Sequence, residues 1–558
     1  MSKNPLRIVI IGGVAGGASA ATRARRMNES AEIVVLEKDE HVSFANCGLP
    51  YYIGGEIAER GKLLVATAEF LRRRFKLDVR TRHEARSINR DAKTVEVFDH
   101  QKQTAYQLPY DKLILAPGAA PLTPPLEGLT AAGVFTLRNM ADTDRIHAAT
   151  NQSRTKRAAV IGSGFIGLEM VEQLERRGFQ VALAELQPHI LPLLDPEMTQ
   201  PLREELTTHH VSVHTGDGIQ RVMTNAAGAV CGVQLASGTV IDADLVILGL
   251  GVRAQTALAT QAGLAIGASG GIATNAWLQT SDPNIYAVGD AAEYPYGPTG
   301  TQMRVALAGP ANRAGRLAGE HAATGKSDPM PPVFGTSIVR VFEWSAGITG
   351  LSAASAKRFG IAARSVTVIA NHHAGYYPGA QPLTLKLTYA PDTGRILGAQ
   401  AIGREGVDKR LDVIATAMAF RGTVRDLAGL DLAYAPPFGS AKDPIHQAAF
   451  AACNQLDGIE DFIEADADLS GLQVVDVRTP GEVRDRPLKS APHAINIALD
   501  ELRQRHHELD ANVPTVVSCG VGVRGHVAAR ILKQSGFNQV QNLTGGATLR
   551  SRAVKEQE

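Results

Sequence analysis

The strongest constraint on the fold is a unit of strand, glycine turn, helix and strand that occurs twice. In the first copy an apolar strand leads into GGVAGG at 12–17, and the second strand ends in Glu37. In the second copy the turn is GSGFIG at 162–167, and the second strand ends in Glu185. Glycines permit the tight turn and close helix packing, the helix N-terminus faces a pyrophosphate, and the terminal acid accepts ribose hydroxyls. The chain therefore contains two predicted dinucleotide-binding units.

The two units differ at one position that bears on the bound nucleotide. Val14 stands where the first turn would carry its middle glycine, which predicts a less close approach of the pyrophosphate there. Glu185 favours NADH over NADPH, because a carboxylate repels a 2′-phosphate and no arginine follows it directly. The predicted contacts are Gly12, Gly16, Gly17 and Glu37 in the first unit and Gly162, Gly164, Gly167 and Glu185 in the second.

Length and composition narrow the class of protein further. A chain of 558 residues is long enough for three or four domains. Its net charge of +1 gives no field that would attract nucleic acid or a membrane, and no apolar run reaches the roughly 20 residues of a membrane span. The N-terminus enters a strand directly, so we expect no signal peptide and a cytoplasmic location. The dispersed cysteines predict neither a disulfide framework nor a metal site; they are Cys47, Cys231, Cys453 and Cys519.

Two further segments fit a chain that binds two dinucleotides. YDKLILAPGAAP at 110–121 reads as a strand running into a glycine turn, with Ala116 and Gly118 as predicted cofactor contacts. NIYAVGDAAE at 284–293 reads as a buried strand that ends at Asp290 and is followed by the start of a helix. An aspartate at that place can bind the ribityl hydroxyls of a flavin.

Residues 1 to about 450 resemble the pyridine nucleotide-disulfide oxidoreductase family, in its single-cysteine branch of coenzyme A-disulfide reductases, NADH oxidases and NADH peroxidases. The resemblance rests on SFANCGLP, LAPGAAP, GSGFIGLE, NIYAVGDAAE and AGPANRAGR. It implies an α/β protein with two Rossmann-like three-layer domains and an α+β dimerisation domain. The implied boundaries are an FAD-binding domain at 1–118 and 254–330, an NAD-binding domain at 119–253 and a dimerisation domain at 331–450.

The resemblance places Cys47 beside the flavin as a thiol without a cysteine partner. Relatives that form a redox-active disulfide carry their second cysteine where this chain has Val42. The thiol can therefore pair only with a group that arrives from outside, such as a small thiol, a sulfane sulfur or a peroxide. Further cofactor contacts implied by the family are Lys38, Phe165, Glu169 and Ala308.

The C-terminal segment predicts a second reactive thiol. After a predicted linker at 451–468, LQVVDVR reads as a buried strand, and a later strand ends in CGVGVR at 519–524, which opens a helix. Backbone N–H groups and a helix N-terminus stabilise a thiolate or persulfide anion on such a loop. The segment 469–558 resembles an α/β rhodanese domain. The resemblance makes Cys519 a sulfane-sulfur acceptor and lets Arg524 position the loop and its anion.

Three reactions remain open for Cys47 from the residues alone. It can form a mixed disulfide with coenzyme A that is reduced with electrons from the flavin. It can be oxidised to a sulfenic acid in an oxidase or peroxidase. It can take the outer sulfur of a persulfide or polysulfide and release hydrosulfide.

The predicted dimerisation domain favours a sulfur substrate. A His-Glu acid–base pair is absent from the DLAYAPP region, but Tyr434 lies there and Tyr376 in HHAGYYPG, with Tyr377 beside it. Two tyrosines facing a partner subunit's Cys47 resemble the coenzyme A-disulfide reductase arrangement, in which phenols donate to a departing thiolate. Predicted coenzyme A contacts are Arg26 and Arg74 for the phosphates and Ser43 and Asn46 for the pantetheine.

The sequence therefore predicts an FAD-dependent, NADH-driven reductase of coenzyme A persulfide, polysulfide or coenzyme A disulfide. We expect a homodimer with small-molecule partners only, in which Cys519 handles sulfane sulfur. An NADH oxidase or peroxidase that uses a Cys47 sulfenic acid is the alternative, followed by a redox or sulfide sensor.

Overall fold

The structure is a computed structural model that describes residues 5–488 and 490–555. Contacts divide the chain into two compact units. The first comprises the described residues up to Ala184 together with Gly218–Gly335. The second comprises Glu185–Asp217 and the described residues from Thr336 onward.

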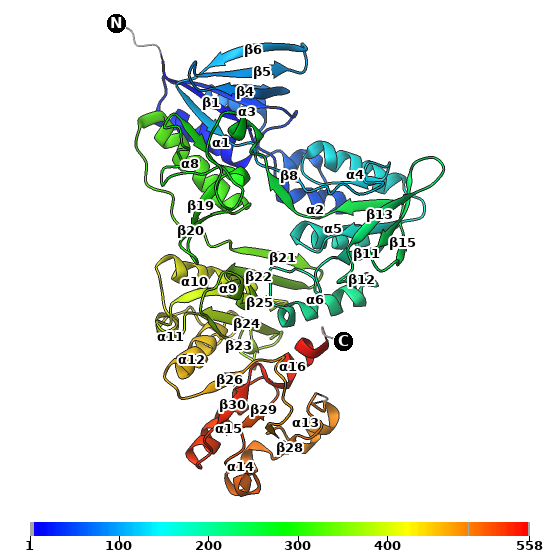
Figure 1. Ribbon diagram of the computed structural model, residues 1–558, viewed down its shortest axis with the longest axis vertical. Helices are drawn as coiled ribbons and strands as arrows, with labels where there is room; N and C mark the ends of the chain where they lie inside the picture. Colours follow the sequence, from blue (N-terminus) through cyan, green and yellow to red (C-terminus); the bar gives the residue numbers. More distant parts are fainter. Residues whose placement is uncertain (1–4, 489, 556–558) are drawn as a thin grey trace. The chain divides into compact units, whose positions relative to one another are not determined.

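The first unit contains a parallel five-stranded sheet that includes β1 (Figure 1). Its order is β18-β7-β1-β2-β3, so the strand that carries the first glycine turn lies in the middle of the sheet. Val, Ile and Leu fill these strands because both faces of a parallel sheet are covered. The strands are β1 (Arg7–Ile11), β2 (Glu32–Glu37), β3 (Asp78–Thr81), β7 (Lys112–Leu115) and β18 (Ile285–Ala287).

Two helices distant in sequence pack side by side against this sheet: α1 (Ala15–Met27) and α8 (Ala308–Thr324). A Cβ on Gly315 would lie 2.2 Å from the carbonyl oxygen of Gly16, which leaves no room for a side chain at that contact. The close approach fixes the start of α8 beside the first glycine turn. Because β18 pairs with β7, a segment far along the chain also completes the sheet.

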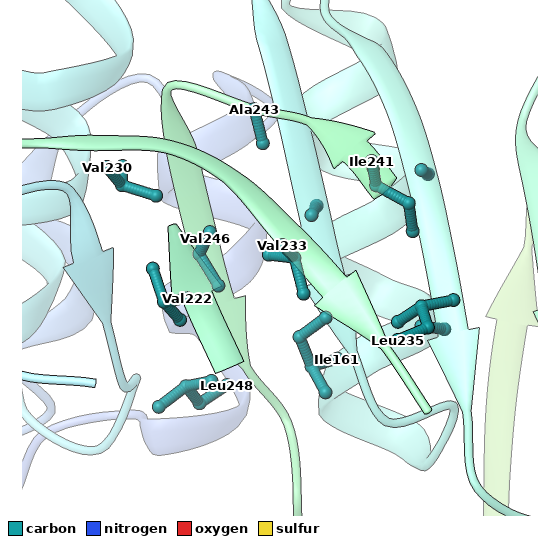
Figure 2. Packing of buried hydrophobic residues seen from close by; sticks show 12 residues of the cluster. Ile161, Val222, Val230, Val233, Leu235, Ile241, Ala243, Val246 and Leu248 are labelled. Carbon is teal, nitrogen blue, oxygen red and sulfur yellow. The ribbon is translucent and has the colours of Figure 1, made fainter. Parts of the chain in front are cut away.

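A second parallel sheet carries the second glycine turn. Within the first unit its strands run in the order β11-β10-β16-β9, and α5 (Phe165–Arg176) follows the turn. A three-stranded antiparallel sheet packs against one face, and Val222, Val233 and Leu235 meet Ile161 and Val246 in a dry core (Figure 2). The strands are β9 (Val134–Phe135), β10 (Arg157–Ile161), β11 (Gln180–Glu185), β16 (Leu245–Leu248), β13 (Ile219–Thr224), β14 (Val230–Leu235) and β15 (Val240–Asp242).

The chain passes between the two sheets through an antiparallel ribbon of β8 (Ala119–Pro121) and β17 (Val252–Ala254). This ribbon lies at the boundaries proposed from the sequence for the FAD- and NAD-binding domains, which stay a prediction. The remaining elements of the first unit are α2 (Leu49–Gly54), α3 (Ala68–Phe75), β4 (His83–Asn89), β5 (Thr94–Asp99), β6 (Thr104–Pro109), α4 (Met140–Gln152), α7 (Ala257–Gln261), β19 (Glu293–Tyr296) and β20 (Thr301–Arg304).

The second unit contains an antiparallel sheet with the strand order β21-β22-β25-β24-β23. Helices cover it, and α12 packs on β23 and β24. The elements are α6 (Pro196–Thr208), β21 (Ser337–Val341), β22 (Trp344–Gly350), α9 (Ala353–Arg358), β23 (Arg364–Asn371), β24 (Pro382–Tyr389), β25 (Ile396–Gly403), α10 (Val407–Ala419), α11 (Val424–Ala428) and α12 (Pro444–Leu456).

The C-terminal sheet of the same unit is parallel, with the order β26-β30-β29-β27-β28. Its first strand lies inside the segment proposed as a linker at 451–468, as does the end of α12. The elements are β26 (Asp461–Ile463), β27 (Gln473–Asp476), α13 (Pro480–Asp485), β28 (Ile495–Asn496), α14 (Leu499–Arg505), β29 (Thr515–Ser518), α15 (Val523–Gln534), β30 (Val540–Leu543) and α16 (Gly546–Lys555).

A buried ion cluster joins α6 to the antiparallel sheet of the second unit. Lys386 Nζ lies 2.8 Å from Asp195 Oδ2 and 2.6 Å from Glu197 Oε1, and the lysine is almost fully buried. Burial opposes protonation, but the two carboxylates raise the pKa of Lys386 above its usual value. The C-terminal helix is tied to the same sheet, because Arg552 Nη1 donates to Thr384 Oγ1 at 3.0 Å. The C-terminal domain is therefore attached to the antiparallel sheet by side-chain contacts as well as by the chain.

None of the helices in the described part of the chain combines the length and hydrophobicity that a bilayer crossing requires.

Candidate active site

The first glycine turn is shaped by contacts that exclude side chains. Gly12 has a φ of +97°, and a Cβ there would lie 2.0 Å from the carbonyl oxygen of Ala116. At Gly17 a Cβ would lie 1.8 Å from the carbonyl oxygen of Gly12, so α1 can start only if both residues are glycine. Gly16 is less constrained, with the nearest atom, of Val288, at 3.0 Å. Gly12 and Gly17 thus shape the turn itself, and Gly16 packs against Val288.

The second glycine turn has the same close contacts and also leaves open space at the start of its helix. Gly162 also has a φ of +97°, and a Cβ on Gly167 would lie 1.9 Å from the Gly162 carbonyl oxygen. A Cβ on Gly164, which caps the start of α5, would meet nothing within 4 Å. Packing of the chain therefore does not require glycine at 164. The open space in front of the helix N-terminus is the room that a pyrophosphate would occupy.

The two acids predicted to bind ribose are buried and hold the adjoining backbone. Glu37 accepts hydrogen bonds from the N–H of Gly13 at 2.8 Å and of Asp39 at 3.0 Å. Burial raises the pKa of Glu37, and these two bonds oppose the shift. Glu185 accepts from the N–H of Gln187 at 2.8 Å. A carboxylate has about four acceptor sites, so Glu37, with these two bonds, keeps capacity for ribose hydroxyls.

Free space also lies at two glycines next to the predicted flavin contacts. A Cβ on Gly309, in the first turn of α8 directly after Ala308, would meet nothing within 4 Å. The same holds at Gly289, which precedes Asp290. These residues fit a bound nucleotide because the chain itself leaves their surroundings open.

The helix start expected at Asp290 is wrong. The residue lies in a single 3₁₀ turn at Gly289–Ala291 and is followed by β19. The carbonyl oxygen of Gly289 accepts a hydrogen bond from the buried Tyr294 hydroxyl at 3.0 Å. A strand of alternating aromatic residues succeeds the turn because its side chains fill the core, which the Gly-Asp-Ala-Ala sequence alone does not indicate.

Cys47 lies in a 3₁₀ turn, Asn46–Gly48, directly before α2. Its neighbours hold the turn in place, since Asn46 Nδ2 donates to the carbonyl oxygen of Arg138 at 3.0 Å. Ser43 adopts a φ of +47° and bonds through its N–H to Gly13 at the first glycine turn. The thiol segment and the first nucleotide turn are therefore linked through the backbone.

Three charged groups act on the Cys47 sulfur. The residue as a whole is exposed, yet desolvation by the neighbouring chain raises the pKa of the thiol. The carboxylates of Glu169 and Asp290 raise it further, while Arg138 lowers it. Arg138 also pairs with Asp290 at 3.0 Å, which partly neutralises that carboxylate. The chain's own charges therefore favour the thiol over the thiolate, and Glu169, on α5, links the two predicted nucleotide sites.

Replacing Glu169 with glutamine should make Cys47 more reactive. Glutamine keeps the oxygen that accepts from the Tyr51 hydroxyl at 3.2 Å but removes the charge that raises the pKa of the thiol. The thiolate then persists to lower pH, so alkylation by iodoacetamide near pH 8 should accelerate roughly two- to fivefold. Peptide mass spectrometry of Cys47 measures the rate. Glu175→Gln on the same helix should leave it unchanged; equal effects of both substitutions would contradict the assignment.

The remaining predicted contacts of the first unit vary in exposure. Phe165 is the first residue of α5 and is half-buried, and Lys38 is exposed after β2. Gly118 is part of the site, since a Cβ there would lie 2.9 Å from Arg138 Nη2. Arg26 and Arg74 are exposed on α1 and α3. Both can therefore be reached by an anion from solvent.

The predicted tyrosines lie together in the second unit. Tyr376 and Tyr434 are 75 % and 48 % exposed, and their hydroxyl oxygens are 2.9 Å apart. The bond to Tyr434 raises the pKa of Tyr376. Tyr377 points elsewhere and packs edge-on against His373, with the ring centroids 5.6 Å apart. The structure brings together the two tyrosines that the sequence selected.

Cys519 follows β29 at the carboxyl edge of the C-terminal parallel sheet. It is 1 % exposed, and the N–H of Gly522 donates to its sulfur at 3.1 Å. Gly522 caps α15 with a φ of +101°, a conformation that side chains disfavour. The loop thus directs a backbone donor and a helix N-terminus at the thiol, as expected.

The carbonyl groups of the Cys519 loop are turned toward α16. The N–H of Ala547 donates to the carbonyl of Cys519 at 2.8 Å, and that of Thr548 to Gly520 at 3.1 Å. A Cβ on Gly546 would lie 2.4 Å from the Cys519 oxygen, so the approach requires glycine. Because a trans peptide places C=O and N–H on opposite sides, the N–H groups of these peptides face away from α16. The N–H that donates to the Cys519 sulfur is that of Gly522.

Arg524 is held by a carboxylate. Its guanidinium makes two bonds to Glu482 on α13, at 2.8 and 2.6 Å, and this partner and the Thr479 N–H lower the pKa of Glu482 to about 2. Arg524 therefore ties α15 to α13, which fixes the loop. A cleft of about 690 Å³ opens beside Gly520, and Arg478 and Arg550 contribute to its wall.

Sequence patterns alone miss several residues that shape these sites. Arg138 lies in no motif, yet it pairs with Asp290 and influences Cys47. Glu460 and Asn542 support the Cys519 loop, and no residue spacing indicates them. Cys47 belongs to the first unit, whereas Cys519 and the tyrosine pair belong to the second.

Three family models match the chain. Residues 6–315 match the pyridine nucleotide-disulphide oxidoreductase model, residues 336–444 match the dimerisation domain of that family, and residues 460–549 match the rhodanese-like domain. These matches confirm the fold class predicted from the sequence.

Known proteins resemble the chain over nearly its whole length. The coenzyme A disulfide reductase of Staphylococcus epidermidis is 34 % identical over 446 residues, which are 80 % of this chain and 99 % of that protein. The structure of reduced Bacillus anthracis CoADR-RHD is 44 % identical, covers 99 % of both chains and has a TM-score of 0.94. A NAD-dependent persulfide reductase from A. fulgidus is 35 % identical, with a TM-score of 0.91 and coverage of 98 % of this chain and 100 % of that chain.

With two nucleotide turns, a lone thiol between them and this extent of similarity, the chain belongs to the pyridine nucleotide-disulphide oxidoreductases, enzymes that use FAD and a nicotinamide, and it carries a C-terminal rhodanese-like domain.

Proposed function

We propose that the protein reduces persulfides, polysulfides and coenzyme A disulfide with electrons from NADH. The observation that carries the proposal is the presence of two distinct thiols in one chain. Cys47 lies without a cysteine partner beside the first nucleotide turn, and Cys519 lies just before α15, where its sulfur accepts a hydrogen bond from the Gly522 N–H. The similarity to a coenzyme A disulfide reductase and to a persulfide reductase supports the same substrates.

The residues of the first turn would hold FAD. Glu37 would accept from its ribose, the N-termini of α1 and α8 would face its phosphates, and Asp290 would bind the ribityl chain. Bound FAD supplies a carrier for an electron pair between a nicotinamide and a sulfur bond. The nicotinamide nucleotide would lie at Gly164 and Glu185, and Glu185 makes NADH the better ligand because its carboxylate repels a 2′-phosphate.

Cys47 acts as the nucleophile. Its thiolate attacks the outer sulfur of a persulfide R–S–SH, so Cys47–S–SH forms and R–S⁻ leaves. An electron pair that originates in NADH then cleaves the new S–S bond, and Cys47–S⁻ and HS⁻ result. The sum is R–S–SH + NADH → R–S⁻ + HS⁻ + NAD⁺ + H⁺. With coenzyme A disulfide the leaving groups are two thiolates.

The tyrosine pair would donate a proton to the leaving thiolate. Tyr376 and Tyr434 share a hydrogen bond, so one hydroxyl can donate while the other supports it. A homodimer, which the dimerisation domain supports, would present this pair to the Cys47 of the partner. Arg26 and Arg74 would bind coenzyme A phosphates, and the free side-chain oxygen of Asn46, with Ser43, would bind the pantetheine.

Cys519 would accept sulfane sulfur and pass it on. Its thiolate attacks the outer sulfur of R–S–SH, forming Cys519–S–SH and releasing R–S⁻. The N–H of Gly522 would stabilise the resulting anionic sulfur. Coenzyme A, as carrier, can then bring the sulfur to Cys47.

NADH oxidation by the purified protein, measured anaerobically with each sulfur acceptor or with peroxide and separately in air, tests the proposal. We expect rapid oxidation with coenzyme A persulfide or coenzyme A disulfide and slow oxidation with oxygen alone. Faster turnover with oxygen or peroxide would instead identify an oxidase or peroxidase, and negligible turnover with every acceptor a sensor. Mass spectrometry should also find coenzyme A on Cys47 and extra sulfur on Cys519.

Alanine should have different effects at two glycines of the second glycine turn. At Gly164 a Cβ meets nothing within 4 Å, so Gly164→Ala should fold normally, but the methyl group occupies the pyrophosphate space and should raise the KM for NADH roughly tenfold. At Gly167 a Cβ lies 1.9 Å from a backbone oxygen, so Gly167→Ala should lower stability by about 1–3 kcal/mol. NADH kinetics and thermal unfolding separate the two. An unchanged KM in Gly164→Ala would contradict the placement of the nucleotide.

A further inference from the structure

A buried polar network reaches the Cys519 loop from the segment that joins α12 to the C-terminal domain. Asn542, on β30, donates from Nδ2 to the carbonyl oxygen of Gly522 at 3.0 Å and to Glu460 Oε1 at 2.8 Å. Asn542 and Glu460 are each 2 % exposed. Glu460 also lies 2.6 Å from Nδ1 of His526 on α15, so one carboxylate contacts a strand and a helix together.

The network reaches the residue that contacts the Cys519 sulfur. Gly522, which receives the Asn542 bond on its carbonyl, donates its own N–H to Cys519 Sγ at 3.1 Å. Its carbonyl also accepts from the N–H of His526 at 3.0 Å in the first turn of α15. The Gly522 carbonyl is therefore held by the backbone of α15 and also by a side chain that no loop motif contains.

The fit around Asn542 is close. A Cβ on Gly525 would lie 2.1 Å from Asn542 Oδ1, so the first turn of α15 can approach the amide this closely only because residue 525 is glycine. A buried amide held this closely cannot turn away from Gly522. Both printed bonds of Asn542 come from Nδ2, and among the described residues its Oδ1 has no hydrogen-bond partner, so the amide is held through its donor group and by packing against Gly525.

We infer that Asn542 and Glu460 are positioning residues that hold the Gly522 N–H toward the Cys519 sulfur, so that the segment entering the C-terminal domain sets the reactivity of its thiol. The role rests on the proposed sulfur chemistry of Cys519. The role goes beyond that chemistry, because neither Asn542 nor Glu460 belongs to the loop or contacts the reacting sulfur. The segment was expected to be only a linker; instead it carries Glu460, which orients Asn542.

The test compares Asn542→Leu and Glu460→Ala with the conservative Glu460→Gln in the full-length protein with bound FAD. Leucine removes the donor at similar volume, alanine removes its acceptor, and glutamine retains an acceptor oxygen. Methyl methanethiosulfonate is the probe: the Cys519 thiolate takes its CH₃S group and releases methanesulfinate. Peptide mass spectrometry gives the rate at Cys519 as a function of pH.

We expect about tenfold slower modification near neutral pH for Asn542→Leu, with the pH profile moved upward, and a smaller loss for Glu460→Ala. Glu460→Gln should stay within about twofold of the wild type. Arg530→Met is the matched control, because Arg530 joins the same helix to the same segment, through the Ile459 carbonyl at 2.7 Å, without touching the loop. It should leave the pH profile unchanged.

Unchanged rates and pH profiles in Asn542→Leu and Glu460→Ala would overturn the inference, as would an equal slowing in Arg530→Met. Thermal unfolding of each variant shows whether it is folded, and the loss expected for Glu460→Ala but not for Glu460→Gln gives a readout if leucine at 542 prevents folding. Failure of the proposed function is a separate result. It would appear as wild-type protein in which Cys519 gains no sulfur from thiosulfate or coenzyme A persulfide, whatever the methanethiosulfonate rates are.

Discussion

Replacing Cys47 with serine is expected to reduce NADH-driven reduction of coenzyme A persulfide and coenzyme A disulfide by at least about 10³-fold. A serine hydroxyl is not ionised near neutral pH and forms no disulfide bond, so the covalent step is lost outright. The nucleotide turns at Gly12 and Gly162 do not involve the thiol. FAD content and the anaerobic bleaching of the flavin by NADH should therefore remain normal. Stopped-flow absorbance with and without the sulfur acceptor measures both halves of the reaction.

Two other cysteines provide the controls for this substitution. Cys231 lies on β14 and Cys453 on α12, away from either predicted reaction, so serine at these positions should retain most of the turnover. Persulfide reduction that survives Cys47→Ser would remove Cys47 from the mechanism. Strong oxygen consumption by the wild type that disappears in Cys47→Ser would favour the sulfenic acid alternative.

The parts of the fold that follow from local backbone demands could be predicted from the sequence. The turns at Gly12 and Gly162 are predictable because only glycine tolerates a φ of +97° and a carbonyl oxygen where the Cβ would lie. The Cys519 loop is visible for a similar reason, since Gly522 caps α15. These constraints act on neighbouring residues and therefore leave a pattern in the chain.

Contacts between distant segments leave no such pattern. Arg138 reaches Asp290 across 152 positions, and Glu460 reaches Asn542 across 82, yet each is an ordinary polar residue in its own segment. The helix start expected at Asp290 was wrong because packing of the following strand, not the Gly-Asp sequence, decides the local structure there. Residues that tune a site through tertiary contacts are thus the ones that sequence reasoning misses.

The two thiols lie in surroundings that suit different tasks. Burial and the carboxylates of Glu169 and Asp290 raise the pKa of the Cys47 thiol, so the chain's own groups disfavour its nucleophilic thiolate. Cys519 instead faces a donor of the chain itself, at Gly522. Cys47 is exposed beside the first nucleotide turn, whereas the Cys519 sulfur is buried and accepts a hydrogen bond that would stabilise an anionic sulfur. Under the proposed function, sulfur capture at Cys519 is separate from reduction at Cys47.

Replacing Cys519 with serine should separate these steps experimentally. The substitution removes the sulfur acceptor, so transfer of sulfur from thiosulfate to cyanide should fall by at least about 10²-fold. Serine has nearly the same volume as cysteine, and the buried site at the end of β29 should remain folded. Reduction of coenzyme A disulfide by NADH requires only Cys47 and should stay within about twofold of the wild type.

NADH oxidation with different sulfur donors then shows whether Cys519 passes sulfur to Cys47. If coenzyme A carries sulfur from Cys519 to Cys47, Cys519→Ser should lose NADH oxidation with thiosulfate plus catalytic coenzyme A but keep it with preformed coenzyme A persulfide. Arg530→Met, which leaves both thiols intact, should support both reactions. Equal turnover of Cys519→Ser and wild type with every sulfur donor would remove the relay, and the rhodanese-like domain would then act without sulfur transfer to Cys47. Loss of activity with preformed coenzyme A persulfide would instead mean that Cys519 takes part in the reductive step itself.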